Sequence, residues 1–401
     1  MKILQVVPYF PPAYAFGGPV KVAFQVSKEL AKRGHEVVVY TSDAKDLDSR
    51  LIVEPVRIID GIEVHYMSNL SIMPVKKSKL FITPELISKT KEEIKNFDVV
   101  HLHEYRTFQN LIIHHYAKKY GVPYVLQARG SLPRIMAKKR LKWAYDVLFG
   151  YRLLRDASKV IALSQTEAGQ YRGMGVPEEK IAIVPNGIDL SEYVDLPPEG
   201  SFKKKFGIPE EKTIILYLGR IHRIKGIDFL VKAYAHVIKD MTRNDAVLVI
   251  AGPDDGYLTQ VKSLSSRLNI SGLQDKIIYT GPLYGKPKLG AYVDSDVLVL
   301  PSRYETFPNV VLESYACSKP VIASKVESIP DIVLCGRTGL LFQAGNVKEL
   351  AEKIWYILMH PEEAENMGHK ARKLVEEKYS IDKVVDKLEV LYEKTLGITQ
   401  K

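Results

Sequence analysis

Short runs of β-branched and apolar residues alternate along the chain with longer segments whose apolar residues recur at helical spacing. The first such unit comprises residues 2–7, a helical stretch at 19–33 ended by Gly34, and a strand at 35–41. Repeated strand–helix–strand units imply a parallel sheet with helices on both faces. The pattern therefore predicts an α/β fold.

Two series of these units follow one another. The 401 residues exceed what one hydrophobic core usually organises, and a segment rich in proline and glycine at 195–200 separates the two series. We therefore expect two doubly wound halves. After the first two strands, further strands are expected at 62–66, 98–103, 123–128, 159–163 and 181–184, and then at 213–218, 246–251, 276–280, 296–300, 320–323 and 339–342.

Positive charge is concentrated in the first half of the chain. The net charge is +10, and residues 1–190 hold 28 Lys and Arg against 19 Asp and Glu. This asymmetry favours an anionic partner for the first half, with ordinary solvated charge as the alternative. Only two cysteines, Cys317 and Cys335, and no apolar run near 18 residues predict a cytoplasmic protein without a disulfide framework or a membrane-spanning helix.

Two cations follow the strand predicted at 213–218. Ligands of parallel sheets bind beyond the carboxyl ends of the strands, and Arg220 and Lys225 lie there, each beside a glycine. An arginine fork and a lysine point charge suit a phosphate or a diphosphate. Mere solvation of both side chains is the alternative, which this pair alone leaves open.

Two glutamates follow the strand predicted at 296–300. Glu305 lies in a loop, and Glu313 lies a little over one turn inside a helix for which Pro308 suits the first position. Carboxylates accept hydrogen bonds from pairs of hydroxyls, so one glutamate can hold a ribose and the other a sugar ring. The alternative is that both are ordinary surface glutamates.

Taken together, the motifs resemble family 4 of the retaining, nucleotide-sugar-dependent glycosyltransferases, over about residues 2–395. The resemblance implies the GT-B fold, an α/β architecture of two Rossmann-like doubly wound domains facing across a cleft. The second half contributes Gly219-Arg220 with Lys225-Gly226, E-x7-E at Glu305 and Glu313, IPDIV from Ile329 and GRTGLLF from Gly336; the first half contributes Gly17-Gly18, DVVHLHE from Asp98, VIALS from Val160 and VPNGID from Val184.

The resemblance also implies domain bounds. Residues 1–190 would form the acceptor-side domain and residues 191–375 the domain that binds the nucleotide sugar. A C-terminal helix within residues 376–401 would cross back to the first domain.

Roles for particular residues follow from the same resemblance. Arg220 and Lys225 would bind the donor diphosphate and stabilise the charge that builds on it during cleavage. Glu313 would accept hydrogen bonds from the ribose, and Gly17 and Gly18 would let the N-terminal loop approach the diphosphate. The transferred sugar would be held by Glu305 and by the segment Thr306, Phe307, Pro308, Asn309 and Val310.

His103 is a further candidate catalytic residue. By resemblance it would touch the transferred sugar near its 6-hydroxyl. Strand alternation places Val99, His101 and His103 on one face, with His103 at the carboxyl end of the strand. Packing within the core, with its ring nitrogens satisfied by the protein, is the alternative.

The resemblance implies a front-face mechanism in which the leaving phosphate takes the acceptor's proton. No metal and no cofactor besides the nucleotide-sugar donor would then be needed. The sequence has no G-x-S-x-G, H-E-x-x-H or P-loop motif and no G-x-G-x-x-G after the first strand, which argues against hydrolase, NTPase and dehydrogenase functions. Glu327-Ser328, Asp331 and Pro308 stand where members of the family often have two glycines, glutamate and glycine, changes that can tune the choice of sugar.

A basic amphipathic segment occupies residues 134–159. One interpretation places it on an anionic membrane or against a lipid phosphate, with Lys138, Lys139 and Arg140 in contact. The other packs its apolar stripe on the sheet and leaves the charges in solvent. That stripe comprises Leu141, Tyr145, Leu148 and Phe149, with Trp143 near its edge.

The acceptor has further candidate contacts in Arg129 and Ser131, which follow the strand predicted at 123–128. The sequence carries no module that reads or stacks bases, so we expect no nucleic-acid partner. The predicted function is a retaining hexosyltransferase that moves a sugar from a UDP- or GDP-sugar to a glycan or lipid-linked acceptor, in the cytoplasm or on the inner membrane face. A soluble-sugar synthase of the same fold and a non-catalytic nucleotide-sugar binder are the alternatives.

Overall fold

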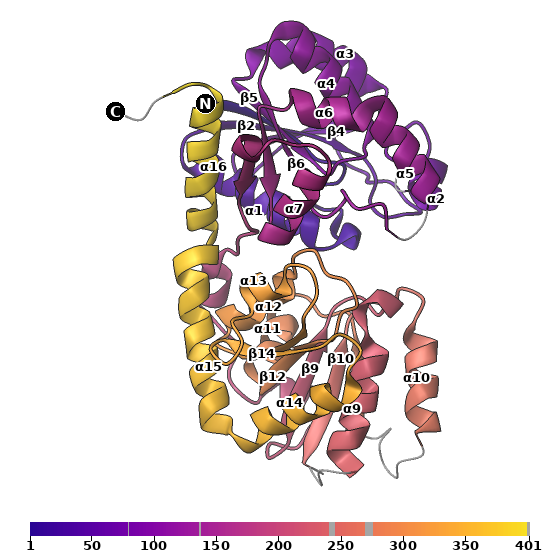
Figure 1. The fold of residues 1–401 in the computed structure, drawn as a ribbon, viewed down its shortest axis with the longest axis vertical. Helices are drawn as coiled ribbons and strands as arrows, with labels where there is room; N and C mark the ends of the chain where they lie inside the picture. Colours follow the sequence, from indigo (N-terminus) through magenta and orange to yellow (C-terminus); the bar gives the residue numbers. More distant parts are fainter. Residues whose placement is uncertain (79, 136–137, 240–244, 269–275, 399–401) are drawn as a thin grey trace. The chain divides into compact units, whose positions relative to one another are not determined.

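A computed structural model of the chain describes all residues except 79, 136–137, 240–244, 269–275 and 399–401 (Figure 1). The chain divides into two compact units. The first unit comprises Met1–Gly187 and Ile381–Lys401, and the second comprises Ile188–Ser380. The boundaries expected at 190 and 375 lie a few residues away, and the C-terminal helix belongs to the first unit.

The first unit is built on an eight-stranded sheet in the order β3-β4-β2-β1-β5-β6-β7-β8. Every strand pair is parallel except β3 with β4. Strand β3 was not expected, because its side chains are exposed at the edge of the sheet and show no buried face to the sequence. The strands are β1 (Lys2–Val6), β2 (Glu36–Ser42), β3 (Val56–Ile59), β4 (Ile62–Met67), β5 (Val99–His103), β6 (Tyr124–Gln127), β7 (Lys159–Ala162) and β8 (Ile181–Ile183).

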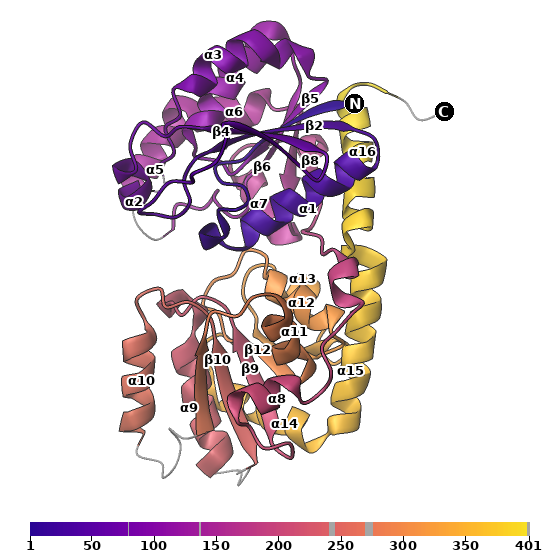
Figure 2. The same cartoon turned by 180° about the vertical axis from the view of Figure 1, so that it is seen from behind.

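Helices cover both faces of this sheet. Apolar residues of α1 (Gly18–Lys32) and α16 (Ile381–Thr395) pack on one face, and the two helices lie side by side (Figure 2). The opposite face is covered by α3 (Glu85–Glu93), α4 (Phe108–Tyr120), α6 (Tyr151–Asp156) and α7 (Gln165–Gly173). Helices α2 (Met73–Ser78) and α5 (Lys139–Tyr145) complete the unit.

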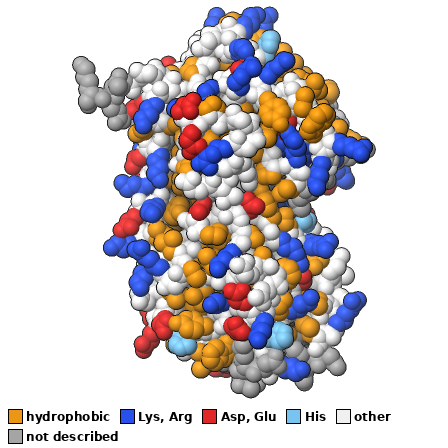
Figure 3. Space-filling view, viewed as in Figure 1, with side chains coloured by type: hydrophobic (Ala, Val, Ile, Leu, Met, Phe, Trp, Pro, Cys, Tyr) orange, Lys and Arg blue, Asp and Glu red, His pale blue; other side chains and the backbone are white. Residues whose placement is uncertain are grey.

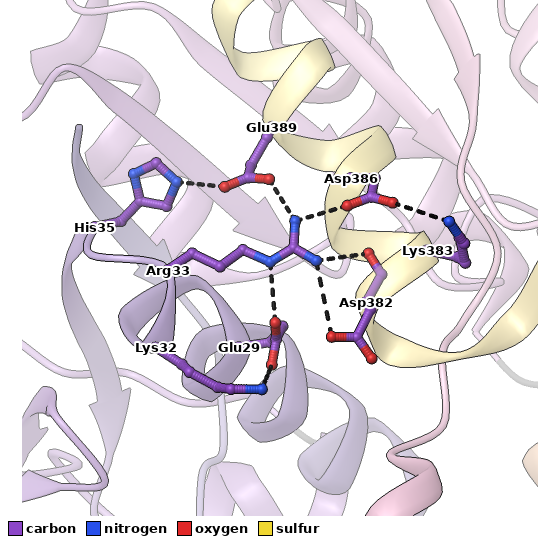
Figure 4. A network of polar contacts seen from close by, with 8 residues as sticks. All are labelled: Glu29, Lys32, Arg33, His35, Asp382, Lys383, Asp386 and Glu389. Atoms are coloured by element: carbon purple, nitrogen blue, oxygen red, sulfur yellow. Dashed lines mark hydrogen bonds and ion pairs between the residues drawn. The ribbon is translucent and has the colours of Figure 1, made fainter.

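A cluster of charges ties α16 to the end of α1 (Figure 4). Arg33 donates to Glu29 at 3.0 Å, to Asp386 at 2.8 Å and to Glu389 at 2.6 Å. Glu389 also lies 2.7 Å from Nε2 of His35. Burial lowers the pKa of Arg33, but these carboxylates outweigh burial and raise that pKa above its ordinary value. The guanidinium therefore stays charged and bridges the two helices.

The second unit has a six-stranded parallel sheet in the order β11-β10-β9-β12-β13-β14. Its strands are β9 (Thr213–Leu218), β10 (Ala246–Ala251), β11 (Ile277–Gly281), β12 (Val297–Leu300), β13 (Val321–Ser324) and β14 (Gly339–Phe342). Its helices are α8 (Ser201–Phe206), α9 (Ile227–Lys239), α10 (Leu258–Arg267), α11 (Gly285–Val293), α12 (Asn309–Ala316), α13 (Ile329–Ile332), α14 (Val347–Met359) and α15 (Pro361–Leu374).

Each sheet contains a point where the strand order reverses. In the first unit β1 lies between β2 and β5, and in the second unit β9 lies between β10 and β12. Ligands of open α/β sheets bind at the carboxyl ends of the strands beside such a point. In the second unit this position falls after β9 and β12, where Arg220, Lys225 and Glu305 follow the strands.

Candidate functional site

The loop after β9 packs directly on the loop after β12. Gly226 has a φ of +67°, and a Cβ added there would lie 1.9 Å from the carbonyl oxygen of Pro301. The amide of Arg303 also donates to the carbonyl oxygen of Ile224 at 2.8 Å. Glycine at 226 is therefore required both by backbone conformation and by space. This contact brings the end of one loop beside the start of the other.

Lys225 and Glu305 form an ion pair at this contact. The Nζ atom of Lys225 donates to Oε2 of Glu305 at 2.5 Å, and both side chains are largely buried. The hydroxyl of Ser302 donates to the same oxygen at 3.2 Å. Lys225 and Glu305 were expected to act on one ligand, and the structure brings their charged groups together.

Arg220 has a carboxylate partner of its own. Its Nη1 donates to Oδ2 of Asp255 at 2.5 Å, and both side chains are about half exposed. Asp255 comes from the loop after β10, which approaches the loop after β9 so closely that a Cβ on Gly252 would lie 1.8 Å from the carbonyl oxygen of Gly219. No sequence pattern pointed to Asp255, because nothing in its spacing connects it with Arg220.

The loop after β12 leads into the N-terminus of α12. Pro308 was expected at the first helical position, but it is the residue before the helix, with φ −83° and ψ 99°. The helix begins at Asn309, so the expectation was wrong by one residue. The first N–H groups of a helix lack intrahelical acceptors and favour anions. The segment Thr306–Val310 connects Glu305 directly to the N-terminus of this helix.

The loop that departs from the family pattern contacts the same segment. The hydroxyl of Ser328 donates to the carbonyl oxygen of Thr306. Glu327 has a φ of +43°, in the left-handed region that favours glycine. This conformation accounts for a preference for glycine at that position, and here the chain adopts it with glutamate.

Glu313 is held from two directions within the second unit. The Nζ atom of Lys288 lies 2.7 Å from each carboxylate oxygen, and the Tyr292 hydroxyl donates to Oε2 at 2.7 Å. Burial and the charge of Glu313 raise the pKa of Tyr292 far above its ordinary value, so this hydroxyl keeps its proton. Lys288 and Tyr292 lie four residues apart on α11 and were not foreseen. The interpretation of Glu313 as a solvated surface residue is wrong, because its side chain is almost fully buried.

The first-unit candidates lie at the ends of β1 and β5. Gly17 has a φ of +82° and precedes α1, which begins at Gly18. His103 is buried, with Nε2 2.6 Å from Oε1 of Gln5 and Nδ1 accepting from Nε of Arg129 at 3.0 Å. Both ring nitrogens are thus satisfied by the protein, as the packing alternative requires. Contact of His103 with a sugar stays a prediction.

Arg129 and Ser131 lie in one turn after β6. Nη1 of Arg129 donates to Oδ1 of Asn186 at 3.0 Å, and the Ser131 hydroxyl donates to the carbonyl oxygen of Ala128 at 2.5 Å. Asn186 belongs to the VPNGID motif that was noted in the sequence, so a signal for it existed. The hydroxyl of Ser131 is directed to the backbone of its own turn, and its role toward an acceptor stays a prediction.

Apart from Tyr145, whose ring packs on Tyr105, the basic amphipathic segment does not bury its apolar stripe. Helix α5 continues through a π-helical turn, Asp146–Gly150, into α6. The inner side of this segment is formed by Asp146, Gly150, Leu153 and Leu154. The apolar side chains left exposed are Leu141 (68%), Leu148 (59%), Trp143 (55%), Val147 (48%) and Phe149 (45%).

Exposed cations accompany these apolar side chains. Lys138, Lys139 and Arg140 are exposed at the start of α5. In Figure 3 hydrophobic and basic side chains lie next to one another over the region of α5 and α6, at the upper right. The π-helical turn explains why the sequence spacing misplaced the buried side of this segment. Hydrogen bonds in a π-helix join residues five positions apart instead of four, which shifts the helix phase that the spacing assumed.

Two family models match the chain. Glycosyltransferase Family 4 matches residues 16–192, and Glycosyl transferases group 1 matches residues 199–374. The chain therefore belongs to the group 1, family 4 glycosyltransferases, and its two parallel-sheet α/β units have the GT-B fold.

Named relatives are similar to nearly the whole chain. N-acetyl-alpha-D-glucosaminyl L-malate synthase of Bacillus anthracis is 25% identical over 394 residues, covering 94% of this chain and 93% of that protein. D-inositol 3-phosphate glycosyltransferase of Gordonia bronchialis is 25% identical over 391 residues, covering 95% and 84%. The solved structure of Anabaena HepE in complex with UDP has a TM-score of 0.77 at 18% identity and covers 98% of this chain and 100% of that one.

No described helix is long and apolar enough to cross a membrane. Within the same residues, no group of three or more His, Cys, Asp or Glu side chains is arranged to hold a metal ion. Metal-independent catalysis stays a prediction.

Proposed function

We propose that the protein is a retaining hexosyltransferase that moves a sugar from a UDP- or GDP-sugar to a glycan or lipid-linked acceptor. The observation that carries the proposal is the Lys225–Glu305 pair at the point where the strand order of the second unit reverses. Membership of the family and the likeness to HepE, which was solved with UDP, support a nucleotide sugar as donor.

The two donor-side cations would exchange their partners when the donor binds. Arg220 is neutralised by Asp255 and Lys225 by Glu305 in the ligand-free protein. A diphosphate offers each cation a more highly charged anion, since it carries at least two negative charges. Glu305, released from Lys225, would then accept hydrogen bonds from hydroxyls of the transferred sugar.

Cleavage would need no metal ion. As the bond between the anomeric carbon and the phosphate oxygen breaks, negative charge grows on the diphosphate, and Arg220 and Lys225 are positioned to stabilise it. The N-terminus of α12 would add its N–H groups and its positive dipole end. The acceptor oxygen would attack from the face the diphosphate leaves, and its proton would pass to the leaving phosphate oxygen.

Glu313 would bind the ribose of the donor. A carboxylate has about four acceptor sites, and Lys288 and Tyr292 occupy some of them while fixing the orientation of the group. We propose that the neighbouring hydroxyls of a ribose donate to this oriented carboxylate. Gly17, Gly18 and His103 retain the roles that the family resemblance implies for them.

The acceptor is proposed to be anionic or membrane-bound. The first unit holds 32 Lys and Arg against 22 Asp and Glu, so it carries the whole net charge of the chain. The names of the two relatives specify L-malate and inositol 3-phosphate, which are both anions. The exposed apolar side chains of α5 and the π-helical turn, flanked by Lys138, Lys139 and Arg140, would let the first unit rest on an anionic membrane.

Thermal unfolding with a panel of UDP-, GDP- and ADP-sugars tests the proposed donor. A ligand that binds only the folded state raises Tm, by an amount equivalent to about 2.7 kcal/mol at 100 times its Kd. We expect UDP- or GDP-sugars to raise Tm and Lys225→Ala to remove most of that rise. Equal stabilisation of wild type and Lys225→Ala would contradict the proposed diphosphate site.

A further inference from the structure

A continuous row of buried polar groups crosses the first unit from Arg129 to His101. Nε of Arg129 donates to Nδ1 of His103 at 3.0 Å, and Nε2 of His103 lies 2.6 Å from Oε1 of Gln5. Nε2 of Gln5 donates to the Tyr392 hydroxyl at 3.4 Å, and that hydroxyl lies 2.7 Å from Nδ1 of His101. Four elements therefore contribute to one row: β1, β5, α16 and the turn after β6.

The fold places these groups in line. Gln5 on β1 is the register partner of His101 on β5, and His101 and His103 point to the same face of the sheet. The two imidazole rings stack with centroids 4.1 Å apart. Tyr392 comes from α16, which packs on this face. All but Arg129 are almost fully buried, so the polar atoms that bond within the row depend on their neighbours in it.

The direction of every hydrogen bond in the row follows from Arg129. A guanidinium only donates, so Nδ1 of His103 must accept and carries no proton. The neutral ring then holds its proton on Nε2 and donates to Oε1 of Gln5. The Gln5 amide consequently turns its NH2 toward Tyr392, whose hydroxyl is left to donate to Nδ1 of His101. Reversing any one bond would require reversing all those beyond it.

We infer that Arg129 is a positioning residue that sets the tautomer of His103 and, through Gln5 and Tyr392, the tautomer of His101. The inference rests on the proposed function only where it concerns His103 and the transferred sugar. With Arg129 in place, Nδ1 of His103 carries no proton and accepts a hydrogen bond from the guanidinium. A ligand that draws the guanidinium away would free the row to reverse and His103 to present an N–H instead.

The charges around the row keep both imidazoles neutral in either direction. Burial, the ring of His101 and the charge of Arg129 hold the pKa of His103 well below its ordinary value, and burial with Arg129 lowers the pKa of His101 to about 3. Burial lowers the pKa of Arg129 as well, and the charges of Glu104 and Glu167 oppose this by raising that pKa. A change of tautomer, rather than a change of charge, is therefore the event to measure near neutral pH.

Nitrogen-15 NMR of the histidine rings in the full-length protein measures both tautomers without a substrate. Signals of His101 and His103 are assigned by comparison with His101→Asn and His103→Asn. At pH 7.5 we expect wild type to hold both rings with the proton on Nε2. In Arg129→Met the two directions of the row become close in energy, so a second tautomer of at least about 20% should appear at both histidines.

Tyr392→Phe separates transmission through the row from the loss of a nearby charge. In Arg129→Met with Tyr392→Phe, His103 should still show two tautomers, but the Arg129 substitution should no longer alter His101. Lys95→Met, which removes an exposed cation of the same unit, should leave both rings as in wild type. If His101 responds to Arg129→Met equally with tyrosine or phenylalanine at 392, the row does not transmit and the inference fails.

Tyr392→Phe alone supplies a second test should Arg129→Met not fold. His103 should keep its proton on Nε2, because Arg129 still donates to Nδ1, while His101 loses its fixed tautomer. A second tautomer at His103 in this variant would overturn the assigned direction. Where Arg129→Met folds, its loss of a fixed His103 tautomer should lower kcat for transfer from the nucleotide sugar 3- to 10-fold with donor KM within twofold, and a failure of this kinetic test alone would count against the role of His103 toward the sugar.

Discussion

Single residues in the second unit show how the cations of the candidate site are paired with carboxylates. Lys225 and Glu305 form a largely buried pair, whereas Arg220 and Asp255 form an exposed one. A buried cation without a partner would cost several kcal/mol, so the carboxylates stabilise the site until the donor arrives. The exposed Arg220–Asp255 pair contributes little to folding. We therefore expect substitution of Arg220 to affect catalysis far more than stability.

Alanine substitution tests the cations individually. Arg220→Ala or Lys225→Ala should lower kcat/KM for transfer or donor hydrolysis by roughly 100-fold, about 3 kcal/mol of transition-state stabilisation. Lys232→Ala, an exposed cation on α9, is the matched control and should retain wild-type rates. Wild-type turnover in either site variant would exclude the proposed diphosphate role.

The position of these residues could be predicted, but their partners could not. Arg220, Lys225 and Glu305 directly follow strands, and strand ends are visible in the sequence as the limits of apolar runs. Asp255 contacts Arg220, and Lys288 contacts Glu313, only because loops and helices distant in sequence meet in the folded unit. Such contacts leave no periodic signal, which is why the groups holding Arg220 and Glu313 were missed.

Among the elements, the segment α5–α6 departs most from what its sequence suggested. Asp146 is fully buried and binds Arg106 at 2.7 Å and Arg134 at 2.7 Å. Arg106 also donates to the carbonyl oxygens of Ser131 and Leu132. A polar anchor, rather than the apolar stripe, thus fixes this segment to the first unit. The apolar side chains are left available for a membrane.

Binding to vesicles containing anionic lipid tests the proposed membrane contact. Simultaneous Lys138→Glu, Lys139→Glu and Arg140→Glu should weaken binding roughly 100-fold, since each cation near such a surface contributes about 1 kcal/mol. The same reversal at Lys203, Lys204 and Lys205 on α8 is the matched control and should change binding less than twofold. Equal effects of the two triple variants would show that Lys138, Lys139 and Arg140 are ordinary solvated charges and do not form a membrane contact.

The docking of α16 depends on the cluster around Arg33 (Figure 4). Arg33→Ala leaves Glu29 with Lys32 alone and Glu389 with His35 alone, and it should lower the free energy of unfolding by about 2 kcal/mol, because it removes charged hydrogen bonds of a partly buried group. Lys383 is more than half exposed and lies 3.8 Å from Asp386, so Lys383→Ala should change stability by less than about 0.5 kcal/mol. Urea unfolding compares the two, and similar losses would show that Arg33 does not bridge the helices.

Across the whole molecule, the repeated strand–helix pattern was sufficient to predict the fold. All the strands expected from apolar runs are present, because strands buried on both faces must be apolar throughout. The edge strand β3 was missed because Val56 and Ile58 are exposed. The sequence predicted that most of the net positive charge lies in residues 1–190. With the bounds of the structure, all of it lies in the first unit.

Two buried histidines should make stability depend on pH. The pKa of His101 is lowered to about 3 and that of His103 well below its ordinary value, so the folded protein excludes protons that the unfolded chain binds below about pH 6.5. Stability should therefore fall on acidification, by about 1.4 kcal/mol per pH unit for each histidine. Urea unfolding between pH 7.5 and 5 should show that the free energy of unfolding falls less steeply with pH in His101→Asn than in wild type. Identical pH dependence in the two proteins would contradict the lowered pKa of His101.

We propose for the second unit that cleavage of a nucleotide sugar proceeds with retention and without a metal ion. Proton NMR of the sugar first released from an α-linked donor, in the presence of chelator, tests it most directly. We expect the α-anomer to appear first in wild type and Lys225→Ala to release it roughly 100-fold more slowly. Initial release of the β-anomer, or cleavage that stops when chelator is added, would contradict the account.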